Sequence, residues 1–218
     1  MWLDARRQQK LVRYEPDDFV VRWQVDINVP AEEGAIVRGR DCVTVGRILC
    51  DELRRYETIE CGESVWEAAD ADSSGLEAAW SSLLDEEGDF RDDEFEGIAD
   101  PVVYVYRFQL HAEFVDWRMA TADAFCRMFG SDAVILAQYH TTWFSEAEFE
   151  LLGFHLLPPT QFPSPAGYPN IDREARFMAR DNACRAEFGL RQYPKDAPEG
   201  RLDHDQWLEE QGPWKDLI

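Results

Sequence analysis

One stretch decides the fold class of this sequence: Val102-Val-Tyr-Val-Tyr-Arg-Phe-Gln-Leu110. It is nearly continuous in β-branched and aromatic residues, which is typical of a strand that is covered on both faces. We therefore expect this segment at the centre of an α/β sheet.

Helical and strand patterns alternate after this stretch. A stripe of apolar residues predicts a helix over about 116–129, and a buried strand is expected at 133–139. Residues 145–152 begin with a capping serine and predict a short helix. The segment 153–158 then leads into a last strand. This alternation is the mark of an α/β domain.

Two further strands are expected before the central one. Residues 19–29 alternate apolar and polar side chains, and 42–53 are apolar around Gly46, where a bulge or turn fits. Capping residues before an apolar stripe predict a helix over about 74–84. The pattern of 56–69 is mixed and predicts no element.

The last quarter of the sequence has a different character. Residues 158–167 hold four prolines, which predicts an extended linker. Alanines and a methionine spaced along about 172–188 predict a helix. We expect residues 1–160 to form one α/β domain, and residues 161–218 to form a proline-rich linker and a helical C-terminal extension.

The net charge of −22, from 44 acids and 22 bases, limits the partners of this protein. A strongly negative field repels nucleic-acid phosphates and anionic membranes, so we expect neither as a partner. The acidity is explained by solubility or a salt-adapted proteome, by a partner with a basic face, or by mimicry of nucleic acid. Nine acids between residues 85 and 100 are the candidate contact surface.

Location and metal binding follow from simple absences in the sequence. No apolar run is long enough to span a membrane, and the N-terminus lacks the apolar core of a secretory signal, so a cytoplasmic location is expected. The sequence has five Cys, an odd number, and no two of them form a C-x-x-C pair. The four His are scattered along the sequence. We expect reduced thiols and no metal site.

The region 102–158 resembles the C-terminal half of a GNAT acetyltransferase domain. In that family a central strand ends in a splayed turn, a helix follows, and a later short helix runs into Leu-Gly-Phe, which here is Leu152-Gly153-Phe154. Val45-Gly-Arg-Ile-Leu49 resembles the central hairpin of the family, and Asp70-Ala-Asp-Ser-Ser74 a segment of one subgroup. The resemblance covers about residues 19–160 and implies a mixed central sheet flanked by helices.

The resemblance also places the acetyl-CoA site. The family binds the cofactor pyrophosphate on backbone N–H groups of a loop (Arg or Gln)-x-x-Gly-x-(Gly or Ala) at a helix N-terminus. The matching residues include Val115 in place of Arg or Gln, Arg118 in place of Gly, and a fitting Ala120, so the loop is degenerate. Together with the end of the preceding strand, the candidate cofactor residues are Phe108, Leu110, Val115, Asp116, Trp117, Arg118, Met119 and Ala120.

The catalytic positions are also altered. Where many family members carry a Tyr that protonates the leaving thiolate, this sequence has Phe149, which has no proton to give. His111 and Glu113, near the end of the central strand, are candidates for deprotonating an amine substrate. The alternative is that both are solvent-facing residues at a strand end.

Three functions follow as hypotheses. The first is a GNAT-fold protein that has lost acetyl-CoA binding, needs no cofactor and acts as an interaction or regulatory protein through its acidic surface. The alternative is an acetyl-CoA-dependent N-acetyltransferase for a basic amine or peptide. A rearranged loop that binds another acyl-thioester or a nucleotide is a third reading. The expected partner is a protein with a basic surface or a basic small molecule.

Overall fold

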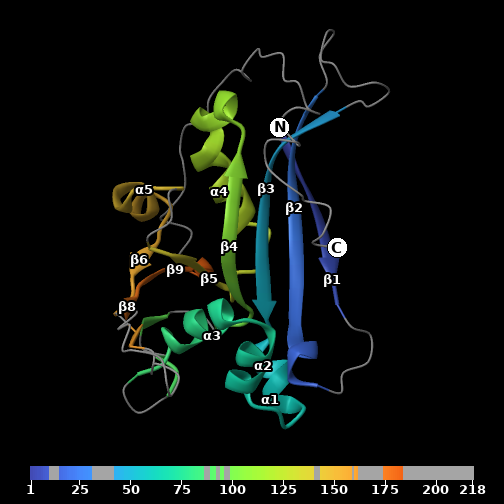
Figure 1. Cartoon of the computed structure of the whole chain (residues 1–218). Coiled ribbons are helices and arrows are strands. Elements are labelled where there is room, and N and C mark those ends of the chain that lie inside the picture. Colours follow the sequence, from blue (N-terminus) through green and yellow to red (C-terminus); the bar gives the residue numbers. More distant parts are fainter. Residues whose placement is uncertain are drawn as a thin grey trace, which may run out of the picture.

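Figure 1 shows the computed structural model of the chain, which describes residues 1–9, 15–30, 42–85, 89–91, 94–95, 99–139, 143–158, 160–161 and 174–183. A mixed sheet of seven strands, in the order β1-β2-β3-β4-β5-β9-β6, dominates the described part. The predicted α/β class is confirmed. The strands are β1 (Trp2–Gln8), β2 (Val20–Pro30), β3 (Cys42–Leu53), β4 (Val102–Leu110), β5 (Val134–Gln138), β6 (His155–Leu156) and β9 (Phe177–Asp181).

The two halves of the sheet are built differently. Strands β1 to β4 are antiparallel to their neighbours, whereas β5 runs parallel to β4. The parallel pairing ends at Val105 and Ala137, although β4 continues to Leu110. Strand β9 lies antiparallel between β5 and β6. A separate pair of two-residue strands joins β7 (Thr160–Gln161) to β8 (Glu174–Ala175).

Two irregularities bend the central strands. Ile27 pairs with Gly46 and Asn28 with Thr44, so β3 has one extra residue beside Gly46, as the sequence predicted. Glycine is required at this position, because an added Cβ would lie 2.5 Å from the carbonyl oxygen of Gln109 on β4. A second shift leaves Tyr106 as the extra residue of β4.

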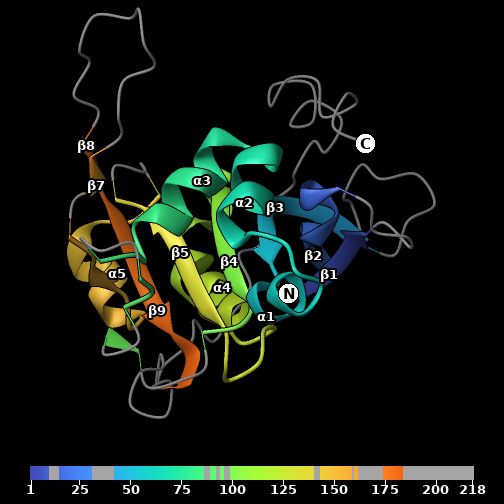
Figure 2. The ribbon, with the colours of Figure 1, turned by 90° about the horizontal axis from the view of Figure 1, so that it is seen from below.

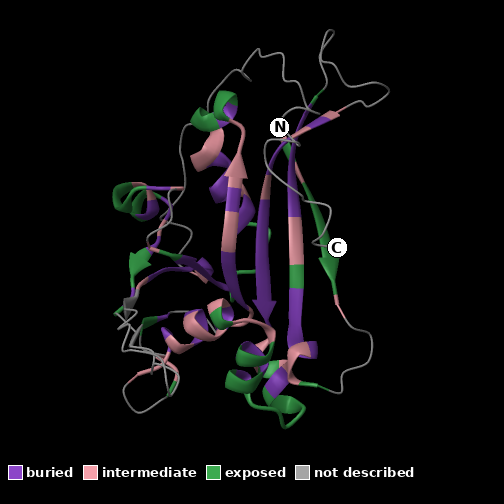
Figure 3. Ribbon diagram, in the orientation of Figure 1, coloured by how far each residue is buried: buried purple, intermediate pink, exposed green. Residues whose placement is uncertain are grey.

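Helices cover both faces of the sheet, as Figure 2 shows from below. On one face lie α2 (Val65–Asp72) and α3 (Ser74–Ser81), and α1 (Arg55–Glu60) lies beside α2 at the lower end of the sheet in Figure 1. On the other lie α4 (Arg118–Cys126) and α5 (Glu146–Leu151). Alternate residues of the central strands enter the two apolar cores, Val102 packing toward α2 and α3, and Val103 toward α4. Figure 3 shows these strands as largely buried.

Serine caps set the helix boundaries. The Ser73 hydroxyl accepts from the Leu76 N–H at 3.2 Å, which starts α3 inside the predicted range. Ser145 and Glu148 form a capping box that starts α5 as predicted. Helices α1 and α2 fall in the segment for which the sequence predicted no element.

The helix expected over about 172–188 is wrong where the structure describes it. Residues 174–175 are β8 and Phe177–Asp181 are β9, which lies in the same sheet as β5 although it follows residue 160. All five residues of β9 are buried, because the strand has neighbours on both sides and cores on both faces. A strand of this kind has no period-2 pattern. Residues 162–173 and 184–218, with most of the expected linker and extension, lie outside the described residues.

Candidate functional site

The expected cofactor loop is occupied by helical backbone. A 3-10 helix, η3 (Ala112–Trp117), runs directly into α4. The Phe114 N–H donates to the His111 carbonyl at 2.9 Å, and the Arg118 N–H donates to the Val115 carbonyl. These two N–H groups are bonded within the turn, whereas the N–H groups at a free helix N-terminus are open to an anion.

Arg118 ties this turn to α5. Its Nη2 pairs with Glu148, and its Nη1 donates to the Val115 carbonyl at 3.4 Å. Glu148 also accepts from the Ser145 N–H at 2.9 Å. The Ser145 backbone and hydroxyl and the Arg118 guanidinium lower the pKa of Glu148, so its carboxylate stays charged beside Arg118. The guanidinium is thus engaged with α5.

The remaining candidate cofactor residues are divided between solvent and core. Val115 and Asp116 are exposed on the 3-10 helix, and Trp117 is half-buried. Phe108 and Ala120 are buried. Leu110 and Met119 pack against the core on the α4 face. Phe108 lines the small cavity on the α4 face, and none of the eight residues lines the pocket on the other face of the sheet.

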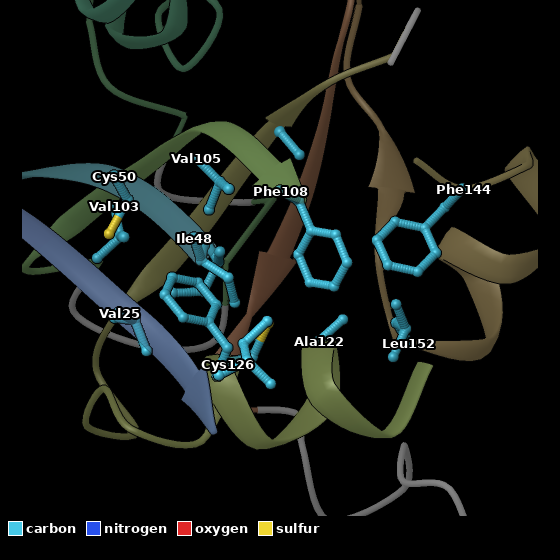
Figure 4. Packing of buried hydrophobic residues seen from close by; sticks show 14 of the residues in the cluster. Val25, Ile48, Cys50, Val103, Val105, Phe108, Ala122, Cys126, Phe144 and Leu152 are labelled. Atoms are coloured by element: carbon cyan, nitrogen blue, oxygen red, sulfur yellow. The ribbon is translucent and has the colours of Figure 1, made fainter. Parts of the chain in front are cut away.

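Aromatic rings fill the space between the sheet, α4 and α5 (Figure 4). The ring centroids of Phe108 and Phe144 are 5.2 Å apart, and those of Phe144 and Phe149 are 5.5 Å apart. Phe149, the residue in place of the family tyrosine, is therefore part of the core. The cavity left among these rings is about 30 Å³, which accommodates about one water molecule.

His111 and Glu113 have a local structural role. The His111 Nδ1 accepts from the Glu113 N–H at 3.2 Å and so caps η3. The His111 N–H donates to the Val45 carbonyl at 2.8 Å, which holds the end of β4 against β3. The Glu113 side chain is exposed. Neither residue lines the cavities on the two faces of the sheet.

A different site lies on the sheet face that carries α2 and α3. It is a pocket of about 600 Å³, which is within the size range of small-molecule sites. Strands β1 to β4 form its floor, and the α2–α3 junction forms one wall. The pocket is lined by Arg6, Gln8, Arg22, Trp23, Gln24, Arg47, Leu49, Asp51, Asp72, Ser73, Gly75, Tyr104 and Tyr106.

Three charged residues meet at the edge of this pocket. Arg22 Nε lies 3.4 Å from Asp51 Oδ1, and Arg22 Nη2 lies 2.9 Å from Asp72 Oδ1. The side chains of Asp51 and Asp72 are 4% and 11% exposed, whereas that of Arg22 is 53% exposed. One guanidinium therefore serves two buried carboxyl groups. With both ionised, the cluster has a net charge of −1.

The environment of Asp51 favours the neutral, protonated form of its carboxyl group. Burial, and then the neighbouring carboxyl of Asp72, raise the pKa of Asp51 to about 7, against the opposing effect of Arg22. Burial also raises the pKa of Asp72. A proton held by Asp51 is shared with Asp72, whose Oδ2 is buried and has no hydrogen-bond donor among the described residues. The pair thus offers a site for one proton or one donor.

Tyrosines form the side of the pocket next to this pair. The rings of Tyr104 and Tyr106 are 6.1 Å apart, and burial raises the pKa of both hydroxyls, so they are neutral donors at physiological pH. Gly75 lets α3 approach closely, because a Cβ there would lie 3.0 Å from the Tyr104 ring. Arg47, farther along the floor, is held by Asp26 at 2.6 Å.

Sequence reasoning missed this site because its members are joined by strand register. Arg22 and Asp51 face each other across β2 and β3, and Asp72 comes from the end of α2. The signal available was the presence of charged residues of both signs inside the two strands, such as Arg22 in β2 and Asp51 in β3. Buried acids at such positions require partners.

The comparisons and searches add no identification. No protein-family model matches the sequence, and no curated protein matches it significantly. Among the described residues, no three His, Cys, Asp or Glu side chains gather as a metal site. None of the described helices is long and apolar enough to cross a membrane.

Proposed function

We propose that this chain is a GNAT-like protein that binds a basic small molecule in the pocket of Arg22, Asp51 and Asp72, and that it does not hold acetyl-CoA at the start of α4. The observation that carries the proposal is the buried carboxyl pair at the edge of a pocket of about 600 Å³, served by a single guanidinium. No cofactor is required for binding.

The GNAT-like part of the proposal rests on the order of elements. A central strand is followed by η3 and α4, by the parallel strand β5, and by the short helix α5 that runs into Leu152-Gly153-Phe154. Strands β4 and β5 stop pairing at Val105 and Ala137, which fits a splayed centre. The turn at Arg118 and the packed rings under α4 support a closed cofactor site.

A cation is the ligand that suits the carboxyl pair. An ammonium group donates several N–H bonds, and Asp72 Oδ2 is a buried acceptor without a donor among the described residues. Its charge replaces the shared proton and neutralises the net charge of the cluster. The aromatic rings of Tyr104 and Tyr106, which line the pocket, favour a cation further. Ligand binding and the loss of a proton from Asp51 are therefore coupled.

Titration calorimetry with a matched pair of compounds tests the proposal. We expect phenethylamine to bind and its neutral analogue phenylethanol to bind at least about tenfold more weakly. Affinity for the amine should rise as the pH increases through about 7, where Asp51 ionises. Asp72→Asn should abolish the preference. Equal affinity for the two compounds, or none for either, would contradict the proposal.

A second candidate is the acetyl-CoA-dependent N-acetyltransferase for a basic amine. The observation that favours it is Asp51, whose pKa of about 7 suits a base that takes a proton from a bound ammonium. Titration with acetyl-CoA and CoA separates the candidates. A micromolar dissociation constant would support the transferase. The absence of heat up to millimolar ligand would support binding alone.

A further inference from the structure

The two helices at one end of the sheet present an unusual surface. Tyr56 and Ile59 on α1 and Trp66 at the start of α2 are 43%, 51% and 45% exposed. Figure 3 shows exposed residues on both α1 and α2 at the lower end of the view. The two helices follow each other in the chain and contact each other, so three large apolar side chains are exposed on neighbouring helices, whereas exposed apolar residues on protein surfaces are ordinarily scattered singly. We name this the α1–α2 surface.

Acidic residues alternate with these apolar side chains along the sequence. Residues 55–70 hold five acids and a single base, Arg55. The Arg55 guanidinium lies 4.0 Å from the centroid of the Phe90 ring and 5.3 Å from that of Tyr56, so it is engaged by aromatic rings of the protein itself. The exposed acids are Glu60, Glu63, Glu67 and Asp70. An apolar centre with a charged rim is the usual anatomy of a protein interface.

Buried side chains and hydrogen bonds fix α1 and α2, which carry the α1–α2 surface. Val65, Ala68 and Ala69 of α2 are buried in the core between the sheet and α2 and α3. Thr58 of α1 is fully buried, and its hydroxyl donates to the Arg54 carbonyl at 2.7 Å. The Ser64 hydroxyl accepts from the Glu67 N–H at 3.3 Å and caps α2. A surface on anchored helices loses little conformational entropy when a partner binds.

We propose that the α1–α2 surface docks a protein whose contact face carries Lys and Arg around an apolar centre. The charge decides among possible occupants. A second copy of this chain carries the same charge of −22, and nucleic acids and anionic membranes are also negative, so all three are repelled. A basic protein is attracted by the negative field, which speeds its association, and the complex is stabilised by burial of Trp66. This docking goes beyond the small-molecule pocket and does not depend on it.

Fluorescence anisotropy with a defined probe tests the docking. The probe is a synthetic amphipathic helix of leucine and lysine, and the control peptide has glutamine in place of each lysine. Wild type should bind the basic peptide and not the neutral one. The triple variant Tyr56→Ala, Ile59→Ala and Trp66→Ala should bind it at least about tenfold more weakly, because the apolar centre is lost. Circular dichroism checks that the variant is folded.

Two sets of charge-reversal substitutions distinguish binding at the α1–α2 surface from attraction by the net negative charge of the whole protein. Changing Glu60, Glu63 and Glu67 to Lys adds six units of positive charge, as does changing Asp4, Asp132 and Glu150, which are exposed on other parts of the protein. We expect the first set to abolish peptide binding and the second to weaken it slightly. Equal losses in the two sets would overturn the proposal. So would self-association of wild type that the triple alanine variant loses, since the occupant would then be a second copy.

Discussion

Arg118, in the first turn of α4, is ion-paired with Glu148, in the first turn of α5. In the GNAT pattern that the sequence resembles, the position of Arg118 belongs to a glycine that lets phosphates approach the backbone. Here a side chain bridges two helices instead. The pair is partly exposed, so its contribution to stability is small, about 0–1 kcal/mol. The importance of the ion pair is that it holds the Arg118 side chain at the start of α4.

The first prediction concerns the turn before α4. We expect neither the wild type nor the double variant Asp116→Gly and Arg118→Gly to bind acetyl-CoA, because η3 and the aromatic packing of Phe108 and Phe144 are present in both. Calorimetric titration of the variant with acetyl-CoA measures this. A micromolar dissociation constant would show instead that only the loop has degenerated and that the rest of the site is intact.

The second prediction concerns pH. The pKa of Asp51 is raised to about 7 in the folded protein from the ordinary 3.8, so the folded state binds this proton more tightly than the unfolded state. The stabilisation is therefore full below pH 4 and is lost as the pH rises through about 7. From pH 5 to pH 8, Asp51 should lower the free energy of unfolding by on the order of 2–4 kcal/mol.

Urea unfolding of wild type and Asp51→Asn across this range isolates the effect. The groups that face Asp51, namely Arg22, Asp72, Tyr104 and Tyr106, are unchanged in the variant. The variant should lose most of the pH dependence between pH 5 and pH 8 and should be the more stable protein at pH 8. An undiminished slope in the variant would assign the effect to other groups, such as Asp72, whose pKa is also raised.

The strands that were predicted correctly are those whose pattern is local. Residues 19–29 alternate, and 42–53 and 102–110 are apolar runs, so their own sequence specifies a strand. Strand β9 was missed because Arg180 and Asp181 interrupt its apolar run, and the partner of Arg180 is Asp123 on α4, 57 positions away. Nothing near β9 in the sequence reveals that burial.

The candidate pocket was missed for the same reason. Arg22 is 29 positions from Asp51 and 50 from Asp72, and the three meet only when β2 pairs with β3 and α2 folds over the sheet. The helix start at Arg118 was predictable, since it depends on neighbouring residues. The resemblance directed attention to His111 and Phe149, which the structure uses as a helix cap and a core side chain.

The third prediction concerns the ion pair of Asp123 and Arg180. Both side chains are 1% exposed, with Asp123 Oδ1 3.2 Å from Arg180 Nη1. Asp123→Ala leaves a buried guanidinium without its counter-charge and should cost about 3–5 kcal/mol of unfolding free energy. The double variant Asp123→Leu and Arg180→Met should be less destabilised than Asp123→Ala, because neither charge of the pair is left buried without its partner.

Arg127 is the matched control for this pair. It also contacts Asp123, at 2.8 Å, but its side chain is 46% exposed. Arg127→Ala should therefore change stability by about 1 kcal/mol or less. Chemical denaturation measures all three variants, and a loss in Arg127→Ala as large as that in Asp123→Ala would refute the distinction between the buried and the exposed partner.

The fourth prediction concerns Gly46, beside the bulge of β3. A Cβ at this position would lie 2.5 Å from the Gln109 carbonyl oxygen and 2.7 Å from Ile27 Cδ1, so backbone or core must shift. Gly46→Ala should cost about 1–3 kcal/mol. Gly130→Ala is the control, because its nearest neighbouring atom would be 4.0 Å away, and it should be neutral or slightly stabilising. Since strands β2 to β4 also form the pocket floor, Gly46→Ala should weaken phenethylamine binding while Gly130→Ala leaves it unchanged. Equal stability of the two variants would mean that the sheet relaxes around the added methyl group.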